Sequence, residues 1–170
     1  QHSVQMQEWS RNNKGYRYML NVIDVFSKFA WSIPLKDKKG ETVTAAFIDL
    51  VRNSNRLPKF LWVDQGKEFC NKNMDKWLKD NNITMYSTFG ENKSAVVERF
   101  NRTLKEIMWK RFTAENTRNW IDMLDRLIAY YNNNRIHTTI GMTPNQASEK
   151  ENYNEALQNT LNKTYPYRKR

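Results

Sequence analysis

The chain has 170 residues, a net charge of +10 and a single cysteine. This length fits one domain with its own hydrophobic core. The charge favours a polyanionic partner, with nucleic acid first, over a basic surface that has no partner. Because Cys70 is alone, a disulfide framework and a cysteine-based zinc site are excluded. No apolar run is long enough to cross a membrane and no signal-peptide pattern opens the chain, so we expect no membrane partner.

The first part of the chain predicts an antiparallel meander of three strands. Residues 1–9 alternate weakly, and residues 16–25 and 29–35 are rich in aromatic and β-branched side chains. The polar segment 11–15 ends in Lys-Gly and has the composition of a turn. Short turns between consecutive strands favour antiparallel pairing.

The middle of the chain alternates helix and strand. Apolar residues recur at helical spacing in residues 42–51 and again in residues 73–81. Short apolar strands are predicted at residues 60–63 and 83–87. Because a helix separates these strands, we expect them to pair in parallel.

The rest of the chain is predicted to be helical and then basic. One helix spans about 95–112, and a second, capped by residues 116–117, spans 118–131. Thr143-Pro144 is typical of a helix start, with a hydroxyl cap and proline at the first position. We expect residues 149–170 to be a basic tail, acting as a linker or as a phosphate-binding arm.

Two carboxylates lie in the settings that a divalent-metal site needs. Asp64 ends the apolar strand 60–63 and is followed by Gln65-Gly66, which permits a tight turn. Glu98 lies in the first turns of the helix 95–112. Oxygen ligands at a strand end and a helix start can hold a metal that stays open to a phosphate.

The helix that carries Glu98 has a polar stripe. Glu98, Asn101, Arg102 and Lys105 follow one another at i, i+3, i+4 and i+7. On these residues alone, a solvated face with a Glu98–Arg102 pair is the simpler interpretation. The alternative is that the carboxylate holds a metal while the amide and the cations hold DNA phosphates.

Four motifs resemble the catalytic core of the retroviral and retrotransposon integrase family, most closely the integrases of Maverick-type DNA transposons. The resemblance covers about residues 5–147. Its motifs are the strand 21–31, the segment 63–69, the segment 94–106, and a last group made of Tyr131, Asn132, His137, Gly141, Thr143 and Pro144. Their shared order and spacing make the match specific.

The resemblance implies an α/β protein of the RNase H-like fold, with a five-stranded mixed sheet flanked by helices. The core domain would be residues 1–148. The family's reaction is metal-dependent phosphoryl transfer, so Mg²⁺ or Mn²⁺ is the expected cofactor. We also expect DNA as the partner, a homodimer, no small-molecule substrate, and a nuclear location.

Matching the motifs residue by residue implies a site. Asp64 and Glu98 match the second and third metal-binding, catalytic acids. DNA contacts are expected from a set of basic and amide residues around them: Lys67, Lys93, Asn101, Arg102 and Lys105.

The family's first acid is missing, because its position is occupied by His2. A neutral imidazole offers one lone pair and no negative charge, so two dications close together would be poorly held and strand transfer reduced. Glu8 and Glu68 lie at unsuitable positions, and Asp24 lies on the second strand, where the family often has an acid without a metal role. Three explanations stay open for this replacement: a domesticated or decayed integrase, a substitution that was introduced, and a different register at the N-terminus.

Three functions follow from these observations. The first is an integrase core that binds DNA and transfers strands poorly. The second is a domesticated, non-catalytic module for DNA binding or self-association. An RNase H-type nuclease outside integration explains the motifs around Asp64 and Glu98 less well. His137 is expected to be a loop histidine bonded to backbone, because two histidines and one cysteine make a zinc site implausible.

Overall fold

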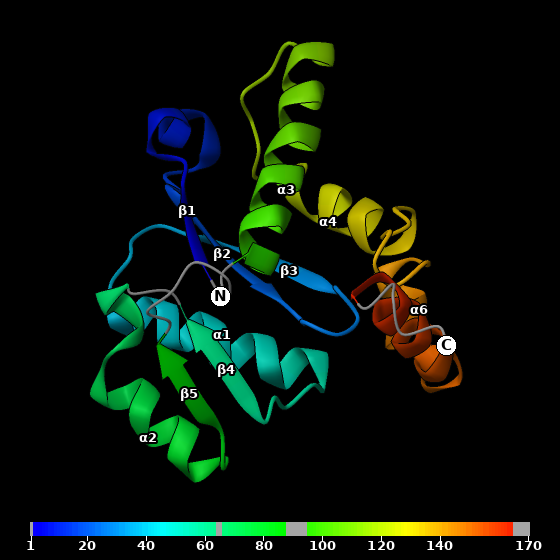
Figure 1. The fold of residues 1–170 in the computed structure, drawn as a ribbon. Coiled ribbons are helices and arrows are strands. Elements are labelled where there is room, and N and C mark those ends of the chain that lie inside the picture. The colour runs from blue at the N-terminus through cyan, green and yellow to red at the C-terminus, as the bar shows by residue number, and fades with distance from the viewer. Residues whose placement is uncertain (1, 64–65, 88–94, 165–170) are drawn as a thin grey trace.

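The computed structural model describes residues 2–63, 66–87 and 95–164. Its first sheet is an antiparallel meander, as predicted (Figure 1). The sheet consists of β1 (His2–Gln5), β2 (Tyr18–Ile23) and β3 (Ala30–Leu35), and a 3₁₀ helix, η1 (Gln7–Asn13), follows β1. Pro34 is tolerated in β3 because this strand is at the sheet edge in the order β1-β2-β3.

The second sheet is parallel and has two strands, which confirms the predicted pairing across a helix. Its strands are β4 (Phe60–Val63) and β5 (Thr84–Ser87), joined through η2 (Lys67–Phe69) and α2 (Lys72–Asp80). The helix α1 (Gly40–Ser54) connects β3 to β4. In the described ranges the five strands form ladders of three and two rather than the single five-stranded sheet that we expected.

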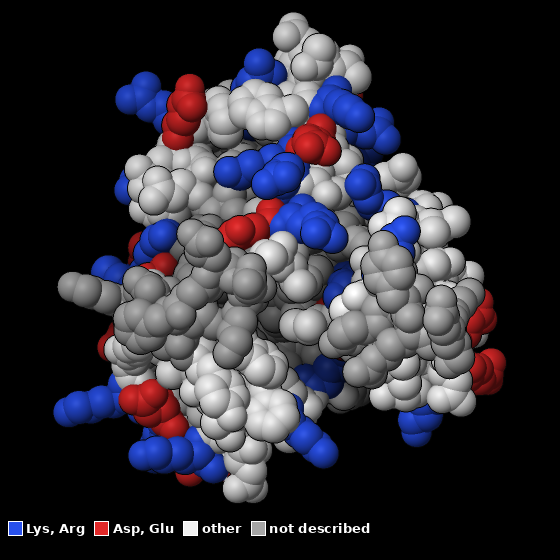
Figure 2. All heavy atoms as spheres, in the orientation of Figure 1, with Lys and Arg blue, Asp and Glu red and all other residues white. Residues whose placement is uncertain are grey.

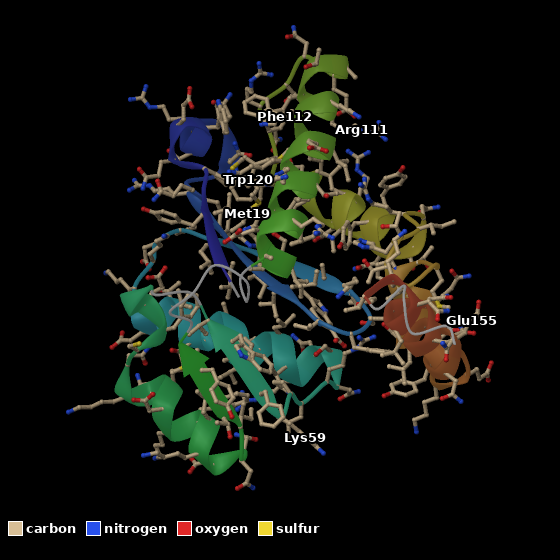
Figure 3. The ribbon with its side chains drawn as sticks, viewed as in Figure 1. Met19, Lys59, Arg111, Phe112, Trp120 and Glu155 are labelled. Atoms are coloured by element: carbon tan, nitrogen blue, oxygen red, sulfur yellow. The ribbon has the colours of Figure 1, made fainter. Side chains whose placement is uncertain are left out.

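Helices cover both faces of the three-stranded sheet. Met19 packs with α3 (Ala95–Ala114) and α4 (Leu124–Asn133), in a cluster that includes Phe112 and Trp120. These three side chains converge between the sheet and α3 (Figure 3). Leu20, the next residue of β2, belongs to a second cluster with α1, α2 and β4. Successive side chains of β2 therefore point to opposite faces of the sheet, and each face packs in its own hydrophobic core.

The helix predicted at 118–131 begins only at Leu124, and Asn13 explains the difference. The buried Asn13 side chain accepts hydrogen bonds from the backbone N–H groups of Trp120 (2.7 Å) and Ile121 (3.0 Å), and it donates to the Arg118 carbonyl (2.9 Å). A helix that began at 118 would need the Arg118 carbonyl for the Asp122 N–H, and this carbonyl is instead used by Asn13, about a hundred residues away in sequence.

The C-terminal segment is more ordered than the predicted tail. Thr143 caps α5 (Pro144–Ser148) with a capping box, as the sequence indicates. After η3 (Lys150–Asn152), α6 (Tyr153–Thr164) packs on this cap, with Ala156 buried and the Tyr153 ring 4.8 Å from the Phe26 ring. Residues 153–164 are thus part of the domain surface, not a free linker. None of the described helices is both long and apolar enough to cross a bilayer.

Candidate active site and nucleic-acid face

Of the two predicted acids, the structure describes Glu98. Glu98 is exposed in the first turn of α3, and the buried Val97 beside it anchors that turn to the core. Asp64, the residue after β4, and Lys93 lie outside the described residues. Within the described ranges, no group of three or more His, Cys, Asp or Glu side chains is placed to hold a metal ion.

A buried polar network joins the position of His2 to α3. In the β1–β2 ladder His2 lies opposite Asn21. The Asn21 amide Nδ2 donates to Asn101 Oδ1 (2.7 Å), and Ser32 Oγ donates to Asn21 Oδ1 (2.6 Å). The backbone position of His2 is therefore linked through Asn21 to Asn101, which is three residues after Glu98 on α3.

This placement differs from the DNA contact that we predicted for Asn101. Its side chain is buried, 8% exposed, and its oxygen is used by Asn21. The Asn101 side chain points toward the sheet because α3 packs closely on β2. Arg102 and Lys105 are exposed on the outer side of the same helix, and their DNA contacts stay predictions.

Basic side chains gather along the outer side of α3. Figure 2 shows lysine and arginine side chains over the length of this helix, with few acids between them. The exposed cations of α3 are Arg99, Arg102, Lys105, Lys110 and Arg111, against the acids Glu98 and Glu106. A row of cations on one exposed helix is typical of a surface that contacts phosphates.

The loop after α4 adds positive charge near the start of α3. Burial of the His137 ring and the positive charges of Arg135, Lys28 and Arg99 lower the His137 pKa to about 4. The ring lies against Tyr131, with 5.2 Å between ring centroids, and its Nε2 atom has no hydrogen-bond partner among the described residues. His137 is therefore neutral at pH 7. Its backbone N–H donates to the Met142 carbonyl, whereas Nε2 makes none of the side-chain bonds to backbone that we expected of this loop histidine, within the described residues.

Sequence reasoning missed the three cations around His137. Arg99 is next to Glu98 and so falls off the stripe at helical spacing, while Lys28 and Arg135 come from distant segments. Burial lowers the pKa of the Lys28 ammonium, and nearby Arg99 lowers it further. A helical-wheel reading of residues 98–106 with Arg99 included could have found one of the three.

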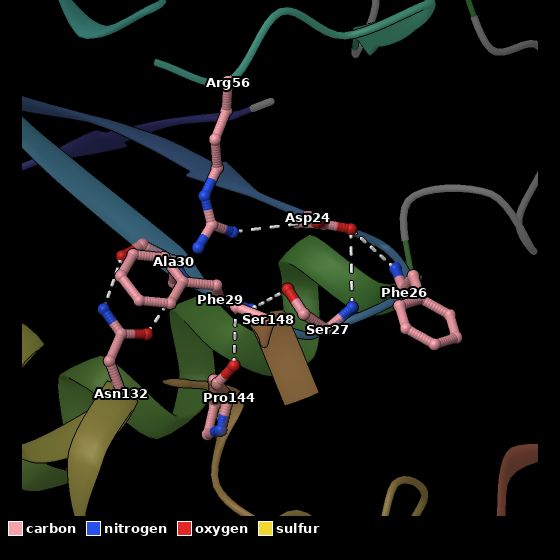
Figure 4. Close-up of polar contacts among 9 residues, drawn as sticks. All are labelled: Asp24, Phe26, Ser27, Phe29, Ala30, Arg56, Asn132, Pro144 and Ser148. Carbon is pink, nitrogen blue, oxygen red and sulfur yellow. Dashed lines mark hydrogen bonds and ion pairs between the residues drawn. The ribbon is translucent and has the colours of Figure 1, made fainter. Parts of the chain in front are cut away.

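Asp24 has a structural role at the end of β2. Its Oδ1 accepts the backbone N–H of Phe26 (2.8 Å) and of Ser27 (3.4 Å), and its Oδ2 lies 3.9 Å from Arg56 Nη1 (Figure 4). The carboxylate therefore closes the turn between β2 and β3.

Gly66 lies close to the Glu68 side chain just before η2. A β-carbon at this position would lie 2.5 Å from Glu68 Oε2, so the Glu68 side chain would have to shift to accommodate a larger residue. Glu68 also pairs with Lys38 at 3.5 Å. The backbone of Lys67 lies in η2, and its side chain is outside the part of the chain that the structure describes.

Comparison with known proteins places this geometry in a family. Residues 6–88 match the integrase core domain family. The chain is 33% identical over 139 residues to a transposon-derived protein of Caenorhabditis elegans, covering 82% of this chain and 48% of that protein. It is 29% identical over 132 residues to the Pol polyprotein of radiation murine leukemia virus, covering 76% of this chain and 22% of the polyprotein.

The chain carries an integrase core domain of the transposon and retroviral type. It spans about half the length of the transposon-derived relative and about a fifth of the polyprotein. The predicted family is thereby confirmed, whereas the roles of individual site residues stay predictions.

Solved structures confirm the RNase H-like fold of this integrase core. The dimeric form of the HTLV-2 integrase catalytic core domain with magnesium aligns with a TM-score of 0.67 and 17% identity, covering 81% of this chain and 88% of that one. A chain of the simian T-cell lymphotropic virus intasome, solved in complex with the PP2A regulatory subunit B56 gamma, aligns with a TM-score of 0.69 and 17% identity, covering 79% of this chain and 49% of that one.

Proposed function

We propose that this integrase core binds DNA along the outer side of α3 and carries a metal-dependent strand-transfer centre of reduced activity. The observation that supports it most is the helix α3 itself. It presents Glu98 in its first turn and the exposed cations Arg102 and Lys105 one and two turns further on. Because the chain matches the integrase family, we interpret this stripe as a metal- and DNA-binding surface rather than as a solvated face.

Each side chain has a distinct task in this proposal. Arg102 and Lys105 neutralise phosphates and set the register of the DNA on the helix. Glu98, with Asp64, supplies carboxylate oxygens for Mg²⁺ or Mn²⁺, which prefer such ligands. A bound dication would lower the pKa of a water or hydroxyl and offset charge at the phosphorus.

The donor set fits one dication better than two. His2 can contribute a single imidazole nitrogen where an acid would contribute a second negative charge. His2 lies in β1, which pairs with β2, and Asn21 of β2 bonds Asn101 of α3. The backbone position of the first ligand is therefore kept next to α3. We therefore propose that the site is assembled but lacks one ligand.

A non-catalytic role is the second candidate, because of the same His2. A domesticated core would keep the α3 cations for DNA binding or self-association and need no metal. Homodimer formation and a nuclear location also remain proposals. The HTLV-2 core has been solved in dimeric and trimeric forms, which supports testing self-association first.

The experiment is a nicking and strand-transfer assay on labelled oligonucleotides in Mg²⁺ and in Mn²⁺. The unmodified chain is compared with His2→Asp, Glu98→Gln and His2→Asp/Glu98→Gln. We expect weak or no activity in the unmodified chain and a gain in His2→Asp. The gain should disappear in the double variant, because both carboxylates are needed.

Two outcomes would change the proposal. Activity in the unmodified chain that exceeds His2→Asp would mean that another residue completes the site. DNA binding that is retained while all four proteins stay inactive would favour the non-catalytic module. Filter binding on the same samples separates loss of chemistry from loss of DNA contact.

A further inference from the structure

The polar stripe of α3 continues beyond the residues that the proposed function uses. Glu98, Arg102, Lys105 and Trp109 follow one another at i, i+4, i+7 and i+11. At 3.6 residues per turn, these four side chains lie within about 60° of one another around the helix axis. The stripe that begins with a carboxylate and continues with two cations therefore ends on a tryptophan.

Trp109 is exposed although its side chain is large and mostly apolar. It is 43% exposed, whereas Met108 and Phe112, which face the core from the same part of α3, are buried. A single exposed apolar residue is common on protein surfaces, so exposure alone does not indicate a site. The contacts and the charges around the ring distinguish Trp109 from such a residue.

The Trp109 ring is held by contacts from its own helix and from two other segments. The Trp9 ring of η1 lies 5.2 Å from it and the Phe112 ring 5.5 Å, both nearly perpendicular to it. The Arg118 guanidinium carbon lies 5.8 Å from its centroid. Figure 1 shows η1 beside the C-terminal half of α3. A side chain that is already held in place loses little conformational entropy when a ligand packs on it.

Asn13 positions the two residues that contact Trp109 from outside α3. Its amide Nδ2 donates to the Trp9 carbonyl (2.7 Å) and to the Arg118 carbonyl (2.9 Å). Both segments are therefore fixed to one buried side chain. The exposed indole is thus part of a surface whose neighbouring residues are themselves held by hydrogen bonds.

Cations lie next to Trp109 on the stripe and beside it. Lys105 is one turn before it, about 6 Å along the helix axis, and Arg118 contacts its ring. Arg102, Lys105 and Arg118 form no ion pair with a carboxylate among the residues that the structure describes. These cations are therefore available to a partner that carries negative charge.

We propose that Trp109 is a stacking platform for an unpaired base of the DNA strand whose phosphates lie on Arg102 and Lys105. Proteins hold single-stranded nucleic acid by combining phosphate-binding cations with aromatic rings on which bases stack. In a duplex the neighbouring bases cover both faces of a base, so only an unpaired base can stack on the indole. This role of Trp109 rests on the proposed function, DNA binding along α3, and adds to it a preference for DNA with an unpaired strand.

A nucleotide matches the surroundings of Trp109 better than a protein partner does. Lysine is depleted from protein–protein interfaces, whereas Trp109 lies between the exposed Lys105 and Lys110. A nucleotide carries a phosphate and a flat ring on one unit. The stripe offers a cation for the first and an indole for the second within one helical turn.

The test measures the affinity of a blunt duplex, and of the same duplex with a single-stranded overhang, by fluorescence anisotropy. Trp109→Leu keeps an apolar side chain against Trp9 and Phe112 but has no flat ring. We expect it to weaken binding of the overhang DNA by about five-fold or more, and binding of the blunt duplex by less than about two-fold. Trp109→Phe should recover most of the affinity, because a smaller aromatic ring still stacks.

A matched control removes an aromatic residue elsewhere. Tyr130 is 51% exposed on α4 rather than on the stripe, so Tyr130→Leu should leave both affinities unchanged. Urea unfolding of Trp109→Leu shows whether the fold is retained. If that variant does not fold, Trp109→Phe and the cross-link below decide the question.

A cross-link locates the base directly. 5-Iodouracil in the overhang, irradiated in the complex, should be recovered on Trp109 in the tryptic peptide 106–110. Equal effects of Trp109→Leu on both DNAs, or a cross-link only to other residues, would overturn the platform. If Arg102→Ala still weakens duplex binding in that case, the proposed function stands without it. A Trp109-dependent preference for the overhang while Arg102→Ala changes nothing would support the platform and contradict the proposed role of the α3 cations.

Discussion

Asn21 Nδ2 and Asn101 Oδ1 lie 2.7 Å apart in the buried interface between β2 and α3. This hydrogen bond holds the helix of Glu98 against the strand that pairs with His2. Because this polar contact lies in an otherwise apolar interface, it specifies one register of α3 on the sheet.

Replacing Asn101 by Ala should destabilise the domain. The Asn21 amide would lose its acceptor inside the core, which costs about 1–3 kcal/mol. Urea unfolding followed by fluorescence measures the change. Arg102→Ala, one residue further on but exposed, is the control and should alter the free energy of unfolding by less than about 0.5 kcal/mol. Equal losses in both variants would contradict a structural role specific to Asn101.

Arg102→Ala and Lys105→Ala should weaken DNA binding without loss of folding. Each removed phosphate contact is expected to reduce the slope of log binding constant against log salt by about 1. The slope is measured by fluorescence anisotropy between low and moderate salt. Lys76→Ala, an exposed cation on α2, is the matched control. If Lys76→Ala reduces the slope as much, binding follows net charge and not the α3 face.

Asn13→Ala should be among the most destabilising polar substitutions. It leaves the backbone N–H groups of Trp120 and Ile121 and the Arg118 carbonyl without their partner. The loss is expected to be on the order of 3 kcal/mol, because several groups become unsatisfied together. Asn12→Ala, exposed and adjacent, should stay within about 0.5 kcal/mol. Thermal and urea unfolding of both variants gives the comparison.

Stability should fall when the pH is lowered from about 6.5 toward 4, and His137 should contribute to the fall. Its pKa is about 4 in the folded chain and about 6.5 when unfolded, so the unfolded state takes up the proton first. Between pH 7 and pH 5 the contribution is at most about 2 kcal/mol. His137→Gln should flatten this part of the profile in urea titrations. An unchanged profile would mean that the carboxylates or His2 carry the dependence.

The local residue pattern was sufficient to predict the elements that depend only on residues near them in sequence. β4 was predicted at 60–63 and found there, because four apolar residues end in a turn signal. The capping box of α5 could be read from Thr143, Pro144 and Gln146 alone, since all its contacts are within three residues. The family was also accessible, because the motifs around Asp64 and Glu98 keep their order and spacing.

Only the tertiary structure decided matters that depend on distant residues. Asn13 moved the start of α4 from residue 118 to Leu124 through contacts far away in sequence, which no local propensity reports. Packing on β2 turned Asn101 inward while its neighbour Arg102 stayed exposed. Lys28, Arg99 and Arg135 act together on His137 because three segments fold to one place. Local patterns determine which helices and strands form. The burial of their side chains and the charges around them depend on which other elements pack against them.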